Sequence, residues 1–362
     1  MAQLDTPLQL SAVLKPKIWG RKDLAPLFTA PVSPGSQNSP ADPRSPGQEL
    51  IGEVWITDDA SRFLNGPVAR LTLAEASRTY GPELHGSRWK DHRFPILAKY
   101  IFTSDWLSVQ VHPGDDYARV HDPGSLGKYE MWYIVGADRR ADILLGLKPG
   151  VDKDALKAAF EKGTSKNLLN RFHPKTGEAI FVPPGTVHAL GPGLVLFEAE
   201  ENSDLTYRLD DFGRLGLDGK PRPLHLEKGL EVTRVDLPAL RDLPRVAFRS
   251  PFGLRRFVLA SRYFAVEELT VQRIASFEGR KDRAEVLSVL EGEGRVETDA
   301  GWLAYCTGET WLIPPGVSRY RLVPGEKTRL LKFYVPDLDK DFRRPLARRG
   351  VKAAKVQKLV FD

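Results

Sequence analysis

Four side chains suited to holding a metal ion lie within residues 110–188. They are Gln110 and His112 in LSVQVHP, Glu130 in GKYEMWYIV and His188 in FVPPGTVHAL. Gln110 and His112 share one face of a predicted strand, because side chains on a strand alternate with a period of two. Imidazole, carboxylate and amide ligands suit a borderline divalent ion such as zinc, and a set without thiolates is typical of a catalytic site. The pattern predicts a metalloenzyme.

Each of these residues also has an ordinary structural interpretation. A lone histidine in a β-run, such as His112, is more often a satisfied structural residue than a ligand. Glu130 leads into the apolar run MWYI, and a buried carboxylate needs a partner, either an arginine or a metal. His188 follows a stiff Pro-Pro-Gly turn and could bond to the backbone there. The three residues together are more specific than any one of them.

The elements that must position these residues are short β segments separated by turn residues, which favours an antiparallel barrel or sandwich. Residues 151–172 differ, because Ala, Leu and Lys recur there at helical spacing and predict one or two short helices. Another helix is expected to begin near Pro223. Residues 31–49 are rich in Pro, Ser and Gly and predict a flexible surface loop. The β segments read LQLSAVLK, ELIGEVWITD, VARLTLAEA and FPILAKYIF.

An internal repeat sets the expected architecture. GEAIFVPPGTVH at 177–188 resembles GETWLIPPGVSR at 308–319, and EMWYIVGA from Glu130 resembles EVLSVLEG from Glu285. The spacing between the two motifs is longer in the first copy, which matches the helical insert. The repeat therefore predicts two related barrels. Arg319 stands in the place of His188, and no histidine follows His225, so the second barrel is expected to lack a metal site.

Composition limits the other classes of function. The net charge of +6 arises after residue 339, where eight basic and two acidic residues leave the rest of the chain near neutral. We interpret this segment as a solvated basic tail rather than a nucleic-acid site, because no known nucleic-acid-binding motif accompanies it. The single cysteine, Cys306, excludes an internal disulfide and fits a reducing cytoplasm. Neither a signal peptide nor a transmembrane helix is expected.

Six motifs carry a resemblance to a known family. The ligand frame resembles the cupin superfamily, and the flanking residues resemble the type I, zinc-dependent phosphomannose isomerases in their short bacterial form. The resemblance covers nearly the whole chain in the same order. The motifs are KIWGRKDL, LSVQVHPGDD, LGKYEMWYIV, FVPPGTVHAL, NSDLTYRLDDFGR at 202–214 and KPRPLHLEKGLE at 220–231.

The resemblance implies a mainly β fold of two cupin-like barrels (jelly rolls) with a small helical insert. The metal-binding barrel is expected to comprise residues 1–150 and 173–215 and to contain the loop 31–49. The helical insert is expected at 151–172, and a linker with a helix at 216–240. The degenerate second barrel is expected at 241–338, followed by the basic tail at 339–362.

The resemblance also implies one zinc ion per chain and a set of site residues. The implied zinc ligands are Gln110, His112, Glu130 and His188. The implied catalytic residues are Lys128, Glu198, Asp204 and Arg208, and the implied substrate-binding residues are Lys99, Ser108 and Trp19. The lysines could instead be surface residues, and Asp204 could simply pair with Arg208. We expect Asp210 and Asp211 to be surface carboxylates.

The implied reaction interconverts mannose 6-phosphate and fructose 6-phosphate through an enediol. The base remains open among Asp204, Lys128, Glu198 and a zinc-bound water. A phosphosugar is the expected partner, with no nucleic acid or membrane, in a cytoplasmic monomer or weak homodimer. The alternatives are a cupin isomerase of another sugar, a non-catalytic sugar-phosphate binder and, more weakly, a structural protein of two barrels. Turnover separates the first from the other two.

Overall fold

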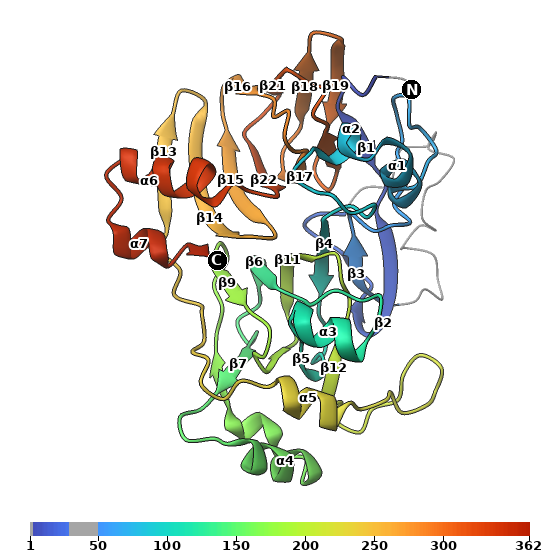
Figure 1. The fold of residues 1–362 in the computed structure, drawn as a ribbon, viewed down its shortest axis with the longest axis vertical. Helices are drawn as coiled ribbons and strands as arrows, with labels where there is room; N and C mark the ends of the chain where they lie inside the picture. The colour runs from blue at the N-terminus through green and yellow to red at the C-terminus, as the bar shows by residue number, and fades with distance from the viewer. Residues whose placement is uncertain (1–2, 29–49) are drawn as a thin grey trace.

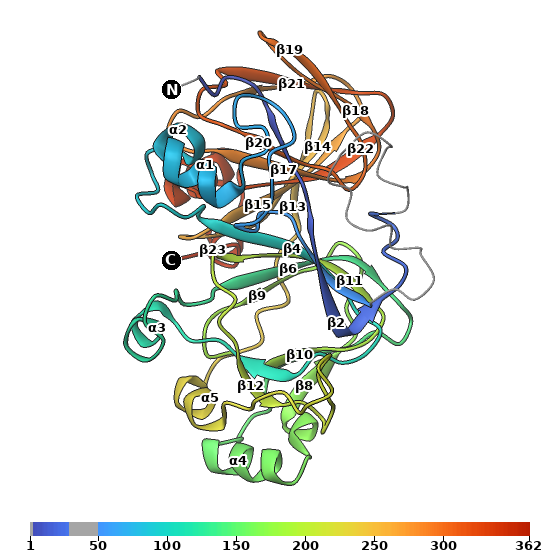
Figure 2. The same ribbon diagram turned by 90° about the vertical axis from the view of Figure 1, so that its right-hand side faces the viewer.

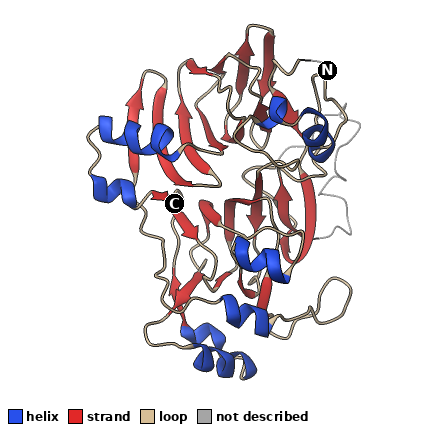
Figure 3. Ribbon diagram, in the orientation of Figure 1, coloured by secondary structure: helices blue, strands red, loops and turns tan. Residues whose placement is uncertain are grey.

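The structure, a computed structural model, describes residues 3–28 and 50–362. The predicted loop 31–49 lies outside the described residues. The fold is mainly β, as predicted, and consists of two cupin-like barrels one above the other (Figure 1). The helices lie at the periphery of the strands (Figure 3).

Each barrel consists of a larger and a smaller antiparallel sheet with an apolar core between them. In the first barrel the larger sheet has the order β2 (Val13–Arg21), β3 (Ile51–Trp55), β4 (Ile96–Phe102), β11 (Leu194–Glu201), β6 (Glu130–Ala137) and β9 (Ala179–Val182). The smaller sheet has the order β12 (Tyr207–Asp210), β5 (Val109–Val111), β10 (His188–Leu190), β7 (Ile143–Leu147) and β8 (Leu169–Phe172).

The second barrel follows the same plan. Its larger sheet has the order β1 (Leu8–Leu10), β20 (Thr310–Ile313), β17 (Glu285–Glu291), β22 (Thr328–Tyr334), β15 (Ala265–Val271), β14 (Gly253–Ser261) and β13 (Val246–Ser250), and β23 (Val360–Phe361) pairs with β14. Its smaller sheet has the order β16 (Ala275–Glu278), β21 (Arg319–Pro324), β18 (Gly294–Thr298) and β19 (Gly301–Tyr305).

The larger sheets of the two barrels pack against each other across one apolar core. Figure 2 shows the strands β4, β6 and β11 of the first barrel lying next to the strands of the second. Phe197 of β11 contacts Phe333 of β22, with ring centroids 5.4 Å apart. The hydroxyl groups of Tyr100 and Ser288 share a hydrogen bond of 2.6 Å across this interface. The strands β4, β6 and β11 are therefore buried on both faces, so alternate side chains enter the first barrel and the shared core.

Helices cover the ends and outer faces of the sheets. α4 and α5 cover the outer face of the smaller sheet of the first barrel, where Leu156 and Phe160 pack on Leu144. The insert at 151–172 is helical only in part, because its last residues form β8. No helix in residues 3–28 and 50–362 has the length and apolarity needed to cross a membrane. The helices are α1 (Leu73–Tyr80), α2 (Pro82–His85), α3 (Asp115–His121), α4 (Lys153–Glu161), the 3-10 turn η1 (Ser165–Leu168), α5 (Leu226–Val232), the π-helical turn η2 (Leu338–Arg343), α6 (Arg344–Arg348) and α7 (Ala353–Gln357).

The internal repeat has a direct structural counterpart. In the first barrel Glu130 on β6 lies opposite Val182 on β9. In the second barrel Glu285 on β17 lies opposite Ile313 on β20. The two repeated motifs therefore pair in the same register in both barrels.

Two expectations about the chain ends need correction. Residues Leu8–Leu10 pair with β20 in the second barrel, although the sequence placed residues 1–150 in the first. The C-terminal segment is not a solvated tail, because Phe342, Leu346 and Leu359 are fully buried against the second barrel. The basic side chains of this segment face solvent, whereas Phe342, Leu346 and Leu359 pack inward. The net charge of the segment gave no sign of this apolar side.

Replacing Phe342 with alanine tests whether this segment is part of the second core. The Phe342 ring packs edge-on against Phe257 at 5.2 Å, so the F342A change is expected to cost about 3–5 kcal/mol of unfolding free energy. Urea unfolding followed by fluorescence measures it. The exposed Arg348→Ala in the same segment is the control, with an expected change within about 0.5 kcal/mol. Equal stability of the two variants would mean that the segment does not stabilise the barrel.

Candidate metal centre and active site

Two histidines and a glutamate from three parts of the first barrel meet inside it. Glu130 begins β6, His188 begins β10, and His112 follows β5 directly. His112 Nε2 lies 3.5 Å from Glu130 Oε2, and His188 Nε2 lies 3.3 Å from Glu130 Oε1. All three side chains are buried. The structure thus brings together three of the four predicted ligands in one cluster able to hold a metal ion.

The Nδ1 hydrogen bonds of both histidines turn the Nε2 lone pair toward the cluster, where His188 Nε2 accepts from Gln110 Nε2 at 3.2 Å and His112 Nε2 has no hydrogen-bond partner among the described residues. His112 Nδ1 donates to the carbonyl of Leu205 at 2.8 Å, and His188 Nδ1 donates to the carbonyl of Thr186 at 2.9 Å. Burial lowers the pKa of His112 well below its usual value and that of His188 to about 4. Both rings are therefore neutral near pH 7, with the Nε2 lone pair pointing at Glu130, as in a histidine that binds a metal.

The nitrogen and oxygen atoms that face one another in this cluster are suited to coordinating a cation. His112 Nε2 and Glu130 Oε1 are buried and have no hydrogen-bond partner within residues 3–28 and 50–362. Burial raises the pKa of Glu130 to about 8. The one proton of the neutral carboxyl can serve only one of the two imidazole contacts at 3.3–3.5 Å, and the other contact leaves two lone pairs facing each other unless a positive charge lies between them. The residues present therefore fit a bound divalent cation.

Gln110 borders this cluster but faces it with its nitrogen. Gln110 Nε2 lies 3.2 Å from His188 Nε2, and Ser108 Oγ donates to Gln110 Oε1 at 3.1 Å. A half-turn of the amide exchanges the two atoms at little cost in shape. The role of Gln110 as a fourth ligand stays a prediction.

A network of buried lysines and carboxylates adjoins the cluster. Lys99 Nζ lies 3.1 Å from Glu198, 2.9 Å from Glu200 and 3.4 Å from Asp204. Lys128 Nζ lies 2.9 Å from Glu130 and 2.8 Å from Glu200. The two lysines thus share Glu200, which links the metal cluster to the wall of the neighbouring cavity.

The protonation states in this network follow from burial and charge. Burial alone would lower the pKa of both lysines, but the surrounding carboxylates reverse the effect and raise both. Burial likewise opposes ionisation of Glu198, yet Lys99 and Lys128 hold the pKa of Glu198, and that of the half-exposed Asp204, below the usual range. The lysines are therefore cations and these two carboxylates are anions at neutral pH.

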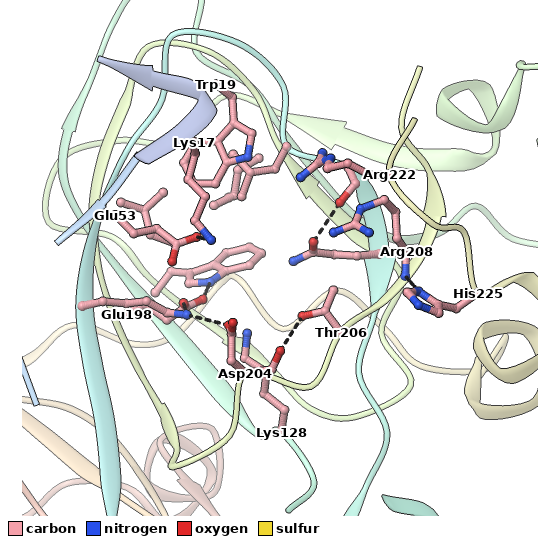
Figure 4. Close-up of a pocket in the computed structure, with 17 residues that line it drawn as sticks. Lys17, Trp19, Glu53, Lys128, Glu198, Asp204, Thr206, Arg208, Arg222 and His225 are labelled. Atoms are coloured by element: carbon pink, nitrogen blue, oxygen red, sulfur yellow. Dashed lines mark hydrogen bonds and ion pairs between the residues drawn. The ribbon is translucent and has the colours of Figure 1, made fainter. Parts of the chain in front are cut away.

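A polar cavity of about 210 Å³ opens beside the cluster (Figure 4). Lys128, Glu198 and Asp204 lie on one side of it, and Arg208, Arg222 and His225 lie on the other (Figure 4). Trp132 forms part of the lining, and its Nε1 donates to Glu198 at 2.7 Å. The remaining lining residues are Lys17, Trp19, Glu53, Lys99, Ile101, Leu107, Ser108, Gln110, Leu190 and Thr206.

The predicted catalytic and substrate-binding residues all line this cavity, and the three clustered ligands lie behind it. Lys99 and Lys128 are buried rather than surface lysines. Asp204 pairs with Lys99, whereas Arg208 Nη1 donates to the carbonyl of Pro223 at 2.9 Å. The interpretation of Asp204 and Arg208 as a simple pair is therefore wrong.

Sequence reasoning missed several residues of the site. Glu200 lies two residues after Glu198 on the same face of β11, and strand alternation alone could have identified it. Lys17 lies two residues before Trp19 on β2 and could have been found in the same way. Thr206, Arg222 and His225 lie within the six motifs of the resemblance, whereas Glu53 lies in none of them. Asp211, expected at the surface, is only 5% exposed, because Arg214 and Arg222 enclose it.

The fold and the site define a class of protein, namely cupin-like proteins in which two histidines and a glutamate that could hold a metal ion lie beside a polar cavity. Comparisons with known proteins narrow this class. The family model of the type I phosphomannose isomerase catalytic domain matches residues 8–130. The chain is 34% identical over 322 residues to the mannose-6-phosphate isomerase ManA of Bacillus subtilis (strain 168), covering 87% of this chain and 95% of the relative. The chain belongs to the mannose-6-phosphate isomerase family.

Solved structures agree on the fold. The mannose 6-phosphate isomerase crystal structure from Bacillus subtilis superposes with a TM-score of 0.81 at 27% identity, covering 91% of this chain and 100% of that one. A zinc-bound mannose 6-phosphate isomerase superposes with a TM-score of 0.70 at 17% identity, covering 91% and 99%. At that identity the second likeness shows the fold alone.

The raised pKa of Glu130 predicts that metal binding releases a proton. Below about pH 8 the metal-free carboxyl is mostly protonated, and a bound cation must displace that proton. His188, with a pKa of about 4, adds no proton in this range. We expect release of about one proton near neutral pH, and an affinity that rises up to about tenfold per pH unit until it levels off above about pH 8.

Titration calorimetry of the metal-free protein with zinc, in buffers of different ionisation enthalpy, measures the number of protons released. The matched control is Glu130→Gln, which keeps the shape of the side chain and cannot release this proton. An affinity for zinc that does not depend on pH between about 6 and 8 would contradict this view of Glu130.

Proposed function

We propose that this protein is a zinc-dependent isomerase that interconverts mannose 6-phosphate and fructose 6-phosphate. The observation that carries the proposal is the His112–Glu130–His188 cluster behind a polar cavity lined by lysines, carboxylates and arginines. Membership of the mannose-6-phosphate isomerase family supports the choice of substrate.

We assign the cation to His112, Glu130 and His188, with Gln110 as a fourth ligand after a turn of its amide. Two neutral imidazoles and a carboxylate suit zinc, and the zinc-bound state of a structural neighbour is consistent with this choice. When bound, zinc supplies Lewis-acid stabilisation of the negative charge that develops on the sugar oxygens.

The residues of the chain hold and polarise the sugar. Lys128 is buried and cationic, so it stabilises negative charge on an oxygen of the enediol rather than accepting a proton. Lys99 keeps Glu198 and Asp204 ionised through contacts of 3.1 and 3.4 Å. The wall of the cavity thus presents both charge signs to the substrate.

Proton transfer between the two sugar carbons requires a group in its basic form. Among the predicted candidates that line the cavity, Glu198 and Asp204 are ionised, whereas Lys128 is protonated. We therefore assign this transfer to one of the two carboxylates. Glu198 is fixed by Trp132 and Lys99, whereas the side chain of Asp204 is 52% exposed and freer to move. Ring opening of the cyclic sugar also needs an acid and a base.

We also propose residues that contact the sugar, a cellular location and an oligomeric state. Trp19 and Ser108, together with Lys99, lie on the cavity wall, and we assign them to contacts with the sugar. The single cysteine fits a cytoplasmic location. A monomer or weak homodimer remains a prediction.

A coupled assay tests the proposal directly. Purified protein is supplied with mannose 6-phosphate, and fructose 6-phosphate is measured before chelation, after chelation and after zinc is restored. We expect activity, its loss and its recovery, with much weaker turnover of free mannose. Bound zinc without turnover of either sugar would contradict the proposed reaction, while the metal site would stand.

Replacement of Lys128 by methionine tests the mechanism. The change keeps the length of the side chain and removes the charge, so we expect kcat to fall by about 10²–10⁴-fold. The exposed Lys175→Met is the control and should keep normal activity. Zinc content and melting temperature are measured alongside, so that loss of metal or fold is recognised. A folded, zinc-loaded K128M enzyme with normal kcat would show that this ammonium group does not stabilise the transition state.

A further inference from the structure

One side of the cavity carries positive charge that no lining carboxylate offsets. Arg208 and Arg222 lie together on this side, opposite Lys128 and Glu198 (Figure 4). Burial lowers the pKa of Arg208, and the charge of Arg222 lowers it further. The carboxylates among the cavity-lining residues, Glu53, Glu198 and Asp204, each contact a lysine instead.

An ion pair between the partly exposed Arg222 and the buried Asp211, at the base of a surface loop, holds Arg222 in place. The loop leaves β12 at Asp211 and returns at Arg222, after a turn in which Gly216 N donates to the carbonyl of Lys220 at 2.7 Å. Asp211 accepts from Arg222 Nε at 2.7 Å and from Arg222 Nη2, and it also accepts from Arg214 Nη2 at 2.8 Å. We call this Asp211–Arg222 contact the loop clasp.

The residues after Arg222 are fastened to Arg208. His225 N donates to the carbonyl of Arg208 at 2.7 Å, and Arg208 N donates to His225 Nδ1 at 3.1 Å. Arg208 Nη1 also donates to the carbonyl of Pro223 at 2.9 Å. The bonds to Pro223 and His225 hold Arg208, and the loop clasp holds Arg222. The two guanidinium groups therefore lie next to each other at the cavity wall (Figure 4).

Both guanidinium groups keep donors for a ligand. The loop clasp uses Nε and Nη2 of Arg222 and leaves Nη1 without a hydrogen bond to any described residue. Arg208 Nε is buried and has no partner in the part of the chain that the structure describes. Two neighbouring cations with unused planar donors suit an anion that carries two negative charges and several oxygen acceptors, as a phosphate monoester does.

We propose that Arg222 is a specificity-determining residue that binds the phosphate group of the substrate together with Arg208, and that Asp211 is a positioning residue for Arg222. This inference rests on the proposed function, because it names the residues that distinguish a phosphosugar from a free sugar. It places the phosphate group on the arginine side of the cavity and the reacting carbons toward Lys128 and Glu198.

Replacement of Arg222 by alanine is the first test, with the exposed Lys220→Ala in the same loop as the matched control. We expect R222A to raise KM for mannose 6-phosphate by about 10- to 100-fold with kcat changed less than about threefold, because a remote binding contact is lost. The inhibition constant of inorganic phosphate should rise in parallel, whereas K220A should alter neither quantity. An R222A enzyme with unchanged KM and unchanged phosphate inhibition would overturn the inference.

Two further variants separate positioning from general stability. Arg222→Lys keeps the charge but cannot form the two-point contact, so its KM should lie between those of the wild type and R222A. Asp211→Asn keeps the shape of the side chain and weakens the loop clasp, so it should raise KM by about 3- to 10-fold with kcat retained. A D211N protein with a lowered melting temperature but unchanged KM would exclude the positioning role.

The inference and the proposed function fail in different ways. If the wild-type protein does not turn over mannose 6-phosphate but binds inorganic phosphate, calorimetry on R222A still decides whether Arg222 binds the anion. Loss of phosphate binding in R222A would then support the anion site while the proposed reaction fails. Turnover by the wild type with phosphate binding unaffected in R222A would leave the reaction standing and overturn the site.

Discussion

The charge balance inside the first barrel constrains the rest of the structure. Glu130, Glu198 and Glu200 are buried together with Lys99 and Lys128, and the half-exposed Asp204 borders them. Four carboxylates thus face two ammonium groups, an excess of two negative charges that a low-dielectric interior opposes. Burial raises the pKa of Glu130 and of Glu200, and the negative charge of Glu198 raises both further. A divalent cation bound beside His112 and His188 would remove this excess, so the proposed metal would complete the electrostatics of the barrel as well as its chemistry.

In the second barrel the counterpart of Glu130 has side-chain partners of its own. Glu285 has the strand register of Glu130, but it lies 3.1 Å from Lys332 Nζ and accepts a hydrogen bond of 2.9 Å from Tyr320. Arg319, at the position of His188, is exposed and lies near Glu278. Side chains of the chain itself therefore compensate the buried carboxylate. The apolar outer face of this barrel packs on β4 and β11, whose inner faces carry Lys99, Glu198 and Glu200, and it thereby supports the site from behind.

The sequence could predict contacts between residues close together in the chain better than contacts between residues far apart in it. Strand alternation predicted that Gln110 and His112 share one face, but the meeting of His112, Glu130 and His188 was implied by the resemblance to a known family, because these three residues lie on or directly after three separate strands. The pairing of β1 with β20 was not predictable, since it joins residues far apart in the chain. The burial of Asp211 was missed for a similar reason, because the loop clasp forms only when the intervening residues fold back. In the C-terminal segment the net charge predicted a solvated tail, although Phe342 and Leu346 are spaced so that both pack inward.

The central claim is that His112, Glu130 and His188 hold the metal that balances this cluster. Anomalous diffraction from crystals of the zinc-loaded protein, recorded on both sides of the zinc absorption edge, tests it most directly. We expect one strong peak within bonding distance of His112 Nε2, His188 Nε2 and an oxygen of Glu130. A second carboxylate group, Glu130 with Glu198 and Glu200, is also close enough to hold an ion. A peak among those three carboxylates, or the absence of a peak from the barrel, would contradict the account.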